Sequence, residues 1–399
     1  MNPMRSCPSV ITIAGVLLLL LPVGCVPYRQ FNTEPEQYLS SLPRPAGSNI
    51  SVDLAIIEFD EFGMFWDTEQ LEAALALIEQ RNASSERGVL LSLYVHGWQH
   101  NADPDQVDGD LSRFRDRLGV LAGQLEVDGR LPTAVVGVYI GWRGATASLP
   151  GVKNLTFWDR RRAGERVANY NVREAMIRLT DATKSRAESK VFLRGHSMGG
   201  MIVGLALGPT IETMVLLSAE DGFESPVDGV FLLNPALDAL STIQLVEFMK
   251  RYGVVGELRY ADGRVEPLQR PVIAAITSEA DWVTRVAYPF GQWLDRKRID
   301  KREFKQDGWP SQSELSSRAT GHLPFLASHR AYVQDGEVVL ERIEGAWNNT
   351  PYWCVTVTEE IGRNHGDSYN PLFQKVLFQL ADPEHLYDTS VRTWLRTTK

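Results

Sequence analysis

Short apolar runs rich in β-branched residues alternate with helical patterns along most of this chain. The runs that predict strands are Asp53–Glu58, Leu90–Val95, Ala134–Ile140, Lys190–Leu193, Gly229–Leu233, Val272–Ile276 and Tyr352–Val357. The stretches that predict helices are Thr68–Gln80, Leu111–Glu126, Arg162–Ala187, Met198–Leu207, Leu240–Arg251 and Asn370–Leu380. Strands that are apolar throughout are buried on both faces, and intervening helices cover those faces. We therefore expect an α/β fold with a doubly wound, mostly parallel sheet.

The length and composition bound the organisation of this fold. The 399 residues are 44% hydrophobic, enough for one large core, and we expect a single domain over residues 51–399. From Trp282 to Ala346 the chain is charged and shows no convincing strand, which predicts a helical or irregular cap insertion above the strand ends. The net charge of −9 argues against nucleic acid as a partner.

The N-terminus has the pattern of a targeting segment over residues 1–25. Arg5 precedes an apolar run, Val10–Val23, which is shorter than the about 20 residues of a membrane span and suits a signal-peptide core. The run ends at Gly24-Cys25, which resembles a bacterial lipobox with Cys25 as the lipidated residue, although Pro22 stands where that motif usually has Leu. Simple secretion and an uncleaved anchor are the alternatives.

The targeting segment predicts an exported protein of the bacterial cell envelope, either lipid-anchored or periplasmic or secreted. Val26 follows Cys25, which by resemblance to Gram-negative lipoproteins favours the outer membrane. Residues 26–50 are rich in Pro, Ser, Gly and Asn and predict a tether to the domain.

A sharp strand-to-helix turn carries the candidate nucleophile. The predicted strand at Lys190–Leu193 leads through Arg194 into Gly195-His196-Ser197-Met198-Gly199-Gly200, followed by an apolar helical run. Small residues on both sides of Ser197 leave room for strained backbone geometry. The hydroxyl then lies at the positive end of the following helix. This arrangement predicts Ser197 as a nucleophile.

A serine nucleophile needs a base and an acid that orients the base. Asp281 follows the strand Val272–Ile276 and is the favoured acid, with Glu279 and Asp238 as rivals and a helix N-cap as its alternative role. His365 follows the last predicted strand and is the favoured base.

Other histidines are weaker candidates for the base. His322 and His329 lie in the irregular insertion, and His385 lies near the terminus. The chain order Ser197, Asp281, His365 is what favours His365.

The loop after Leu90–Val95 is the candidate oxyanion loop. Gly97 allows the backbone to approach a substrate carbonyl, and the amides of Met198 and Trp98 are predicted to bind the developing negative charge. We expect four residues to contact substrate: His96, Gly97, His196 and Trp142.

Two further patterns have alternative interpretations. His96 and His100 with the acids behind them lie on a loop rather than on one helix face, so no metal site is predicted. The loop Ala145–Trp158 carries apolar side chains that could wall an acyl pocket or simply pack the loop.

Taken together, these motifs resemble the α/β-hydrolase superfamily across residues 50–385. Within it, Val95–Asn101 and Tyr139–Gly144 resemble a poorly characterised, esterase-like group of bacterial and fungal proteins. The resemblance implies hydrolysis of a carboxylic ester or related acyl bond through a Ser-His-Asp triad and an acyl-enzyme, with no cofactor. Its substrate would be a small-molecule or lipid-like acyl ester. A thioesterase, lipase or peptidase of the same fold, and a catalytically silent envelope binding or scaffold lipoprotein, are the alternatives.

Overall fold

The computed structural model describes residues 25–85, 87–106, 109–128, 133–148, 152–217, 225–260, 265–267, 271–289, 292, 308–381 and 391–396. The predicted targeting segment up to Gly24, and the candidate base His385, lie outside these residues.

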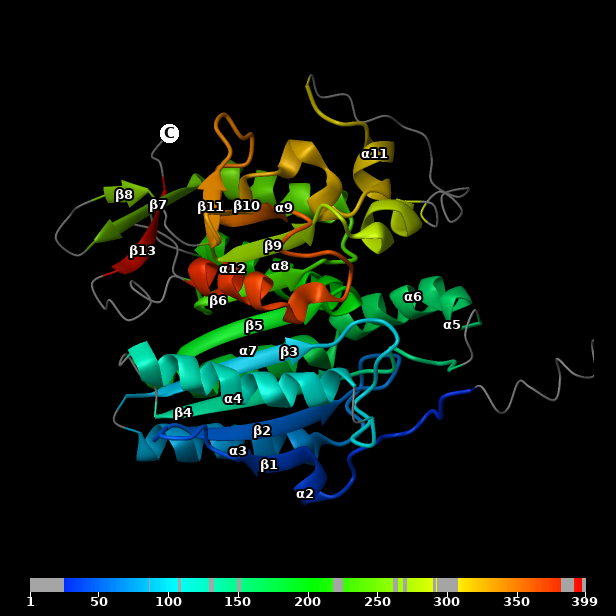
Figure 1. The fold of residues 1–399 in the computed structure, drawn as a ribbon, viewed down its shortest axis with the longest axis vertical. Coiled ribbons are helices and arrows are strands. Elements are labelled where there is room, and N and C mark those ends of the chain that lie inside the picture. The colour runs from blue at the N-terminus through cyan, green and yellow to red at the C-terminus, as the bar shows by residue number, and fades with distance from the viewer. Residues whose placement is uncertain are drawn as a thin grey trace, which may run out of the picture.

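Ten of the described strands form one sheet, drawn edge to edge in Figure 1. In spatial order they are β1 (Leu39–Leu42), β2 (Ser51–Glu58), β4 (Ala134–Gly141), β3 (Val89–Val95), β5 (Lys190–His196), β6 (Gly229–Leu233), β9 (Ile273–Ser278), β12 (Tyr352–Val357), β10 (His329–Gln334) and β11 (Glu337–Arg342). All neighbours from β2 to β10 are parallel, while β1 and β11 close the two edges in antiparallel pairs. The expected doubly wound, mostly parallel α/β fold is confirmed.

Helices cover both faces of this sheet (Figure 1). They are α2 (Pro35–Tyr38), α3 (Thr68–Ser84), α4 (Asp110–Asp128), α5 (Val152–Leu155), α6 (Phe157–Ala168), α7 (Asn171–Lys184), α8 (Met198–Leu217), α9 (Ala239–Arg251), α11 (Gln312–Ser317) and α12 (Pro371–Ala381). Short π or 3₁₀ turns are η1 (Val283–Ala287), η3 (Thr320–His322), η4 (Pro324–Leu326) and η5 (Asp367–Tyr369). A second, antiparallel sheet contains β13 (Val391–Arg396), β7 (Val254–Tyr260) and β8 (Val265–Pro267).

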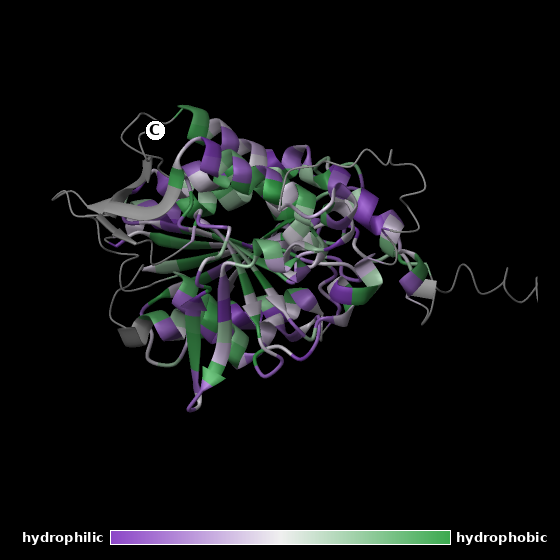
Figure 2. Cartoon of the chain, turned by 90° about the horizontal axis from the view of Figure 1, so that it is seen from above, coloured by the Kyte–Doolittle hydropathy of each residue, from purple (hydrophilic) through white to green (hydrophobic). Residues whose placement is uncertain are grey.

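The core lies where the central strands meet these helices. Every residue of β3 and of β4 is buried, and in Figure 2 the apolar strands lie between helices of mixed polarity. One described helix, α8, is long and apolar enough to cross a membrane by length and composition. It contacts β5, β6 and α6, and its first six residues are buried, so it also serves as a core helix directly behind the nucleophile turn.

The N-terminal tether prediction is wrong for the residues that approach the sheet. β1 pairs with β2, and Asn32 is completely buried, with its amide donating to the carboxylate of Glu58 at 2.8 Å. A buried carboxylate needs hydrogen-bond donors, and this segment supplies them. The edge strand is Leu39-Ser40-Ser41-Leu42, which has no apolar alternation to mark it as a strand in a Pro- and Ser-rich segment.

The predicted cap insertion is also corrected. β10 and β11 form a hairpin that extends the main sheet, and β10 is parallel to β12. Asp335 and Gly336 both have positive φ, at 52° and 82°, which is the turn that favours Asp-Gly in a two-residue hairpin. Residues 293–307, the middle of the predicted cap, lie outside the described chain.

The single helix predicted over Arg162–Ala187 is two helices. The chain leaves α6 at Asn169 and starts α7 at Asn171, with Tyr170 between them at φ −125°. α6 therefore projects along the carboxyl edge of the sheet, beside the loops that follow β3 and β4 (Figure 1).

Candidate active site

The turn between β5 and α8 holds Ser197 in left-handed backbone geometry, with φ of 56°. Such a value is uncommon outside glycine and persists only where neighbouring packing enforces it. A Cβ at Gly199 would lie 2.0 Å from the carbonyl oxygen of Val95, and one at Gly195 would lie 2.4 Å from that of Gly199. The two glycines are therefore required for the turn to pack against β3.

The structure brings the three residues of the predicted triad together. His365 Nε2 lies 2.7 Å from Ser197 Oγ, and His365 Nδ1 lies 2.8 Å from Asp281 Oδ2. They follow β5, β9 and β12, whose carboxyl ends share one edge of the parallel sheet. Ser197 and Asp281 are buried, while His365 is partly exposed. The arrangement is a continuous hydrogen-bonded chain from hydroxyl to carboxylate.

Asp281 is held as a carboxylate by its donors. Burial by itself would raise the pKa of this group, but hydrogen bonds from His365 and Thr284 outweigh it and lower the pKa. Oδ1 also accepts the Val283 amide at 2.9 Å, so the residue caps the following turn as well. The cap and the orienting acid, which the sequence offered as alternatives, are both present.

The rival acids lie elsewhere. Asp238 caps α9 through the amide of Ser241 at 2.8 Å, and Glu279 faces Arg330 at 3.5 Å. Neither is hydrogen-bonded to His365.

A hydrogen-bond network holds the base through its main chain. His196 Nε2 lies 2.7 Å from the carbonyl oxygen of His365, and Asn234 Nδ2 donates to the same oxygen at 3.0 Å. Asn234 Oδ1 accepts the Ser278 amide at 3.0 Å, which ties the base loop to the end of β9. Burial, followed by the proximity of His365, lowers the pKa of His196 to about 4. The buried ring of His196 is therefore a neutral donor that positions His365, the candidate base. This corrects the sequence prediction that His196 contacts substrate.

Asn234 escaped the sequence analysis. It is fully buried with φ of 42°, a conformation that Asn tolerates better than most residues. Its only signal in the sequence is its place, directly after β6 and before Pro235.

Thr284, which the sequence analysis did not identify, extends the hydrogen-bond network from Asp281 to His322. The hydroxyl of Thr284 donates to Asp281 Oδ2 and lies 2.8 Å from His322 Nε2. Burial lowers the pKa of His322 to about 4, so its ring is neutral and Nε2–H donates to Thr284. His322, a rival base in the sequence, instead supports the acid. His329 packs against Trp353, with ring centroids 3.7 Å apart, away from Ser197.

Two predicted substrate contacts are corrected by their burial. His96 and Trp142 are at most 2% exposed, and their rings stack with centroids 5.7 Å apart. Trp142 donates its main-chain amide to His96 Nε2 at 3.1 Å and its indole N–H to the His96 carbonyl at 2.9 Å. The pair therefore fixes the candidate oxyanion loop from the protein interior and leaves no ring surface for a substrate.

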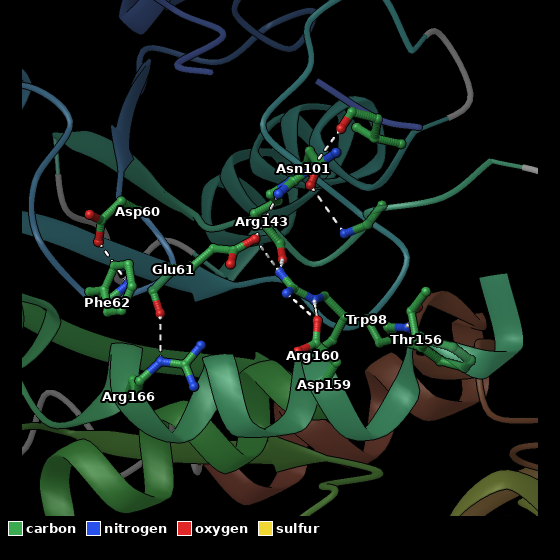
Figure 3. A network of polar contacts seen from close by, with 12 residues as sticks. Asp60, Glu61, Phe62, Trp98, Asn101, Arg143, Thr156, Asp159, Arg160 and Arg166 are labelled. Atoms are coloured by element: carbon green, nitrogen blue, oxygen red, sulfur yellow. Dashed lines mark hydrogen bonds and ion pairs between the residues drawn. The ribbon is translucent and has the colours of Figure 1, made fainter. Parts of the chain in front are cut away.

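The loop itself approaches the nucleophile closely at Gly97. A Cβ there would lie 2.9 Å from the carbonyl oxygen of His196 and 3.0 Å from Cβ of Ser197. Met198 is the first residue of α8, so its amide has no acceptor within the helix. Trp98 packs its ring on Phe157 and donates its indole N–H to Thr156, as Figure 3 shows. The paired amides of Met198 and Trp98 stay a prediction for the oxyanion site.

The segment Ala145–Trp158, predicted as a loop, contains α5 and the first residues of α6, and of its described apolar side chains Phe157 packs on Trp98. Leu155, at its tip, is 82% exposed. Within the described chain, no group of three or more His, Cys, Asp and Glu side chains could hold a metal ion.

Comparisons with known proteins give low-level likeness only. No protein-family model matches the chain, and no curated protein matches its sequence. Among solved structures, TT1662 from Thermus thermophilus is similar at 15% identity and a TM-score of 0.31, over 76% of this chain and 91% of that one. Est1E from Butyrivibrio proteoclasticus is similar at 12% identity and 0.21, over 50% and 71%. Phospholipase PlaB from Legionella pneumophila is similar at 14% identity and 0.25, over 64% and 48%. The fold assignment rests on the strand order and the nucleophile turn themselves.

Proposed function

We propose that the protein is a serine hydrolase that cleaves a carboxylic ester or related acyl bond. The observation that carries this proposal is the hydrogen-bonded chain Ser197–His365–Asp281 on a strained turn at the carboxyl edge of the sheet. A solvated surface serine needs none of these features. Strained backbone and a buried, oriented acid cost stability, and such features cluster at functional sites.

The proposed reaction proceeds through an acyl-enzyme. His365 Nε2 takes the proton of Ser197 Oγ as the oxygen attacks the acyl carbon, and Asp281 stabilises the resulting imidazolium through Nδ1–H. The carbonyl oxygen becomes an oxyanion, which the amides of Met198 and Trp98 would bind. His365 returns its proton to the leaving alcohol. A water molecule, deprotonated by the same base, then attacks the acyl carbon; the bond to Ser197 Oγ breaks, His365 returns the proton to Ser197, and the acid is released.

The contribution of an oxyanion donor to the rate can be given as an order of magnitude. One oxyanion donor is worth on the order of 2.7–4 kcal/mol of transition-state stabilisation. Since the geometry of base and acid is formed without substrate, the reaction needs little reorganisation of the protein. No cofactor is part of the proposed mechanism.

The decisive experiment is covalent labelling of Ser197. A fluorophosphonate probe should modify the folded full-length protein at Ser197, and the label should be absent from Ser197→Ala and from heat-denatured protein. An unlabelled Ser197 in folded protein would overturn the proposal. An acyl panel of short and long esters, thioesters and peptides then separates esterase from lipase, thioesterase and peptidase.

We also propose export, with Cys25 as the lipidated residue. The support is the apolar run that precedes it and its exposed position in the structure. The mass of the mature N-terminal peptide tests this: an unmodified Cys25 still joined to Gly24 would exclude lipidation.

A further inference from the structure

The chain leaves the described domain at its carboxyl edge. Val26 donates its amide to the Thr146 carbonyl at 3.0 Å and accepts from the Arg143 guanidinium at 2.7 Å. Cys25, which is exposed, pairs with Ala147 in an isolated antiparallel bridge. In Figure 1 the first described residues, in dark blue, lie on the side of α5 and α6. The loop after β4 therefore fixes the position of Cys25 at this edge of the domain.

Hydrogen bonds hold the segment that links Cys25 to the sheet. The Glu58 carboxylate accepts the amides of Phe31 at 3.0 Å and Asn32 at 2.8 Å. The side-chain amide of Asn32 donates to the Ala102 carbonyl at 2.7 Å, and the main-chain carbonyl of Asn32 accepts from Gln70 at 2.7 Å. Whatever holds Cys25 therefore also holds the carboxyl edge of the domain.

Half-exposed apolar side chains gather next to this exit point. We call them the aromatic patch: Tyr28, Phe62, Met64 and Tyr170, which are 49%, 59%, 52% and 60% exposed. Asp60 fixes the turn that carries two of them, by accepting the amides of Phe62 and Met64. The Asn171 amide, beside Tyr170, donates to the Gly63 carbonyl at 3.2 Å. Tyr28 packs on Trp66 at the end of the same turn, with ring centroids 5.0 Å apart, so the four side chains surround the turn from Asp60 to Trp66.

An ionic network holds this surface to α6, as Figure 3 shows. Glu61 Oε1 binds Arg143 at 2.8 Å and Arg160 at 2.7 Å, and its carbonyl accepts from Arg166 at 3.1 Å. The Arg166 guanidinium also lies over the ring of Phe62, 5.5 Å from its centroid, within the about 6 Å of a cation–π contact. Because the turn is fixed in this way, exposing Phe62 is a property of the fold rather than of a loose loop.

We propose that the aromatic patch contacts the lipid bilayer to which the N-terminal apolar run leads. Tyr28 lies three residues from Cys25, so a lipid chain on Cys25 or an uncleaved leader brings the patch to the membrane surface. Tyrosine favours the membrane–water interface, and clustered exposed apolar side chains mark interaction surfaces. Asp60 and Glu61 lie in the same region, so the contact is apolar in character and only weakly sensitive to salt.

The proposal deepens the hydrolase reaction, on which this part rests. Ser197 lies at the same carboxyl edge as the patch, so a domain held there draws its ester from amphiphiles in the bilayer. The substrate class would be membrane-presented acyl esters rather than small soluble ones.

Photolabelling from the lipid phase tests the contact without turnover. The full-length protein is reconstituted into phosphatidylcholine vesicles that carry a diazirine on an acyl chain, irradiated and mapped by peptide mass spectrometry. Label is expected in peptides holding the aromatic patch, at both low and high salt. Leu216, Leu217 and Tyr252 are exposed apolar residues remote from the exit point, and their peptides should stay unlabelled.

A matched pair of variants links the contact to activity. Phe62→Ser with Tyr170→Ser should lower hydrolysis of a vesicle-embedded long-chain ester about tenfold, and leave a soluble short-chain ester unchanged. The control, Leu216→Ser with Leu217→Ser, should change neither. Circular dichroism confirms that both variants fold.

Three results would overturn the membrane contact. One is patch labelling no stronger than that of Leu216 and Leu217. The others are cross-links that join the patch to residues 1–24 of the same chain, or to a second copy, in place of lipid. Absence of soluble-ester activity in the wild type would instead count against the hydrolase proposal, so the two failures are distinguishable.

Discussion

Asn234→Ala tests the claim that the base is positioned through its main chain. In the wild type, Asn234 accepts the Ser278 amide and donates to the His365 carbonyl, both at 3.0 Å. The variant leaves the Ser278 amide buried without an acceptor, which costs about 1–3 kcal/mol. Alanine at φ of 42° adds about 1–2 kcal/mol of backbone strain. We expect the free energy of unfolding to fall by about 2–5 kcal/mol.

The effect on catalysis is expected to be separate from this loss. His196 still donates to the His365 carbonyl, so the loop stays but is held by one donor instead of two. A displacement of the base by about 1 Å can cost on the order of 100-fold in rate. We therefore expect kcat for a soluble ester to fall about 10–100-fold, with KM nearly unchanged. Here kcat is calculated from the concentration of protein that the fluorophosphonate labels at Ser197.

Two further variants make the test specific. Asn234→Asp keeps an acceptor for Ser278 and tolerates positive φ, but places a carboxylate oxygen against the His365 carbonyl, so kcat should fall with less loss of stability. Asn348→Ala is the matched control, because Asn348 is also buried and bonds the Tyr352 carbonyl at 2.7 Å, at the opposite end of β12. It should lose stability and keep kcat. Wild-type kcat in Asn234→Ala, or an equal kcat loss in Asn348→Ala, would refute the positioning role.

Three other predictions concern the same region. Gly97→Ala should lower kcat at least about tenfold, because its Cβ would lie 2.9–3.0 Å from atoms of His196 and Ser197. The control Gly119→Ala, whose Cβ has no atom within 4 Å, should keep kcat and stabilise α4 by about 0.5–1 kcal/mol. Equal activities of the two variants would contradict this prediction. His96 and His196 both have a pKa lowered by burial to about 4, so their stabilisation is present above pH 6.5 and is lost as the pH falls towards 4. Each should subtract up to about 1.4 kcal/mol per pH unit, and urea unfolding that gives a constant free energy from pH 6.5 to 5 would exclude it. Trp142→Phe removes the only indole donor to the His96 carbonyl and should lower stability by about 1–3 kcal/mol, read as a shift in Tm.

The sequence predicted the parts of this molecule that repeat a simple period or obey chain order. The buried parallel strands are apolar throughout, and a nucleophile, acid and base must follow their carboxyl ends, so Ser197, Asp281 and His365 could be placed before the structure was known. Contacts that depend on side-chain direction could not. Trp142 follows a strand end as a substrate residue would, yet its ring turns inward onto His96.

The remaining errors have a common physical cause. β1 and the β10–β11 hairpin are edge elements, whose half-exposed residues mix apolar and polar types and so resemble loops. The side chains of Asn234 and Thr284 act through two hydrogen bonds each, mostly to groups that are distant in the sequence, and a lone Asn or Thr after a strand has no distinctive pattern. Such partners become visible only when the loops are assembled.

The bonds of Asn32 also constrain the order in which this protein can be completed. Its side chain reaches the carbonyl of Ala102, 70 residues further along the chain, so the first described segment can bond Glu58 and Gln70 earlier but completes its hydrogen bonds only when Ala102 has been made. If the chain is exported, its leading segment is held at the translocation machinery during this interval. The pairing of β1 with β2 needs only residues up to Glu58, so it can precede the bond from Asn32 to Ala102.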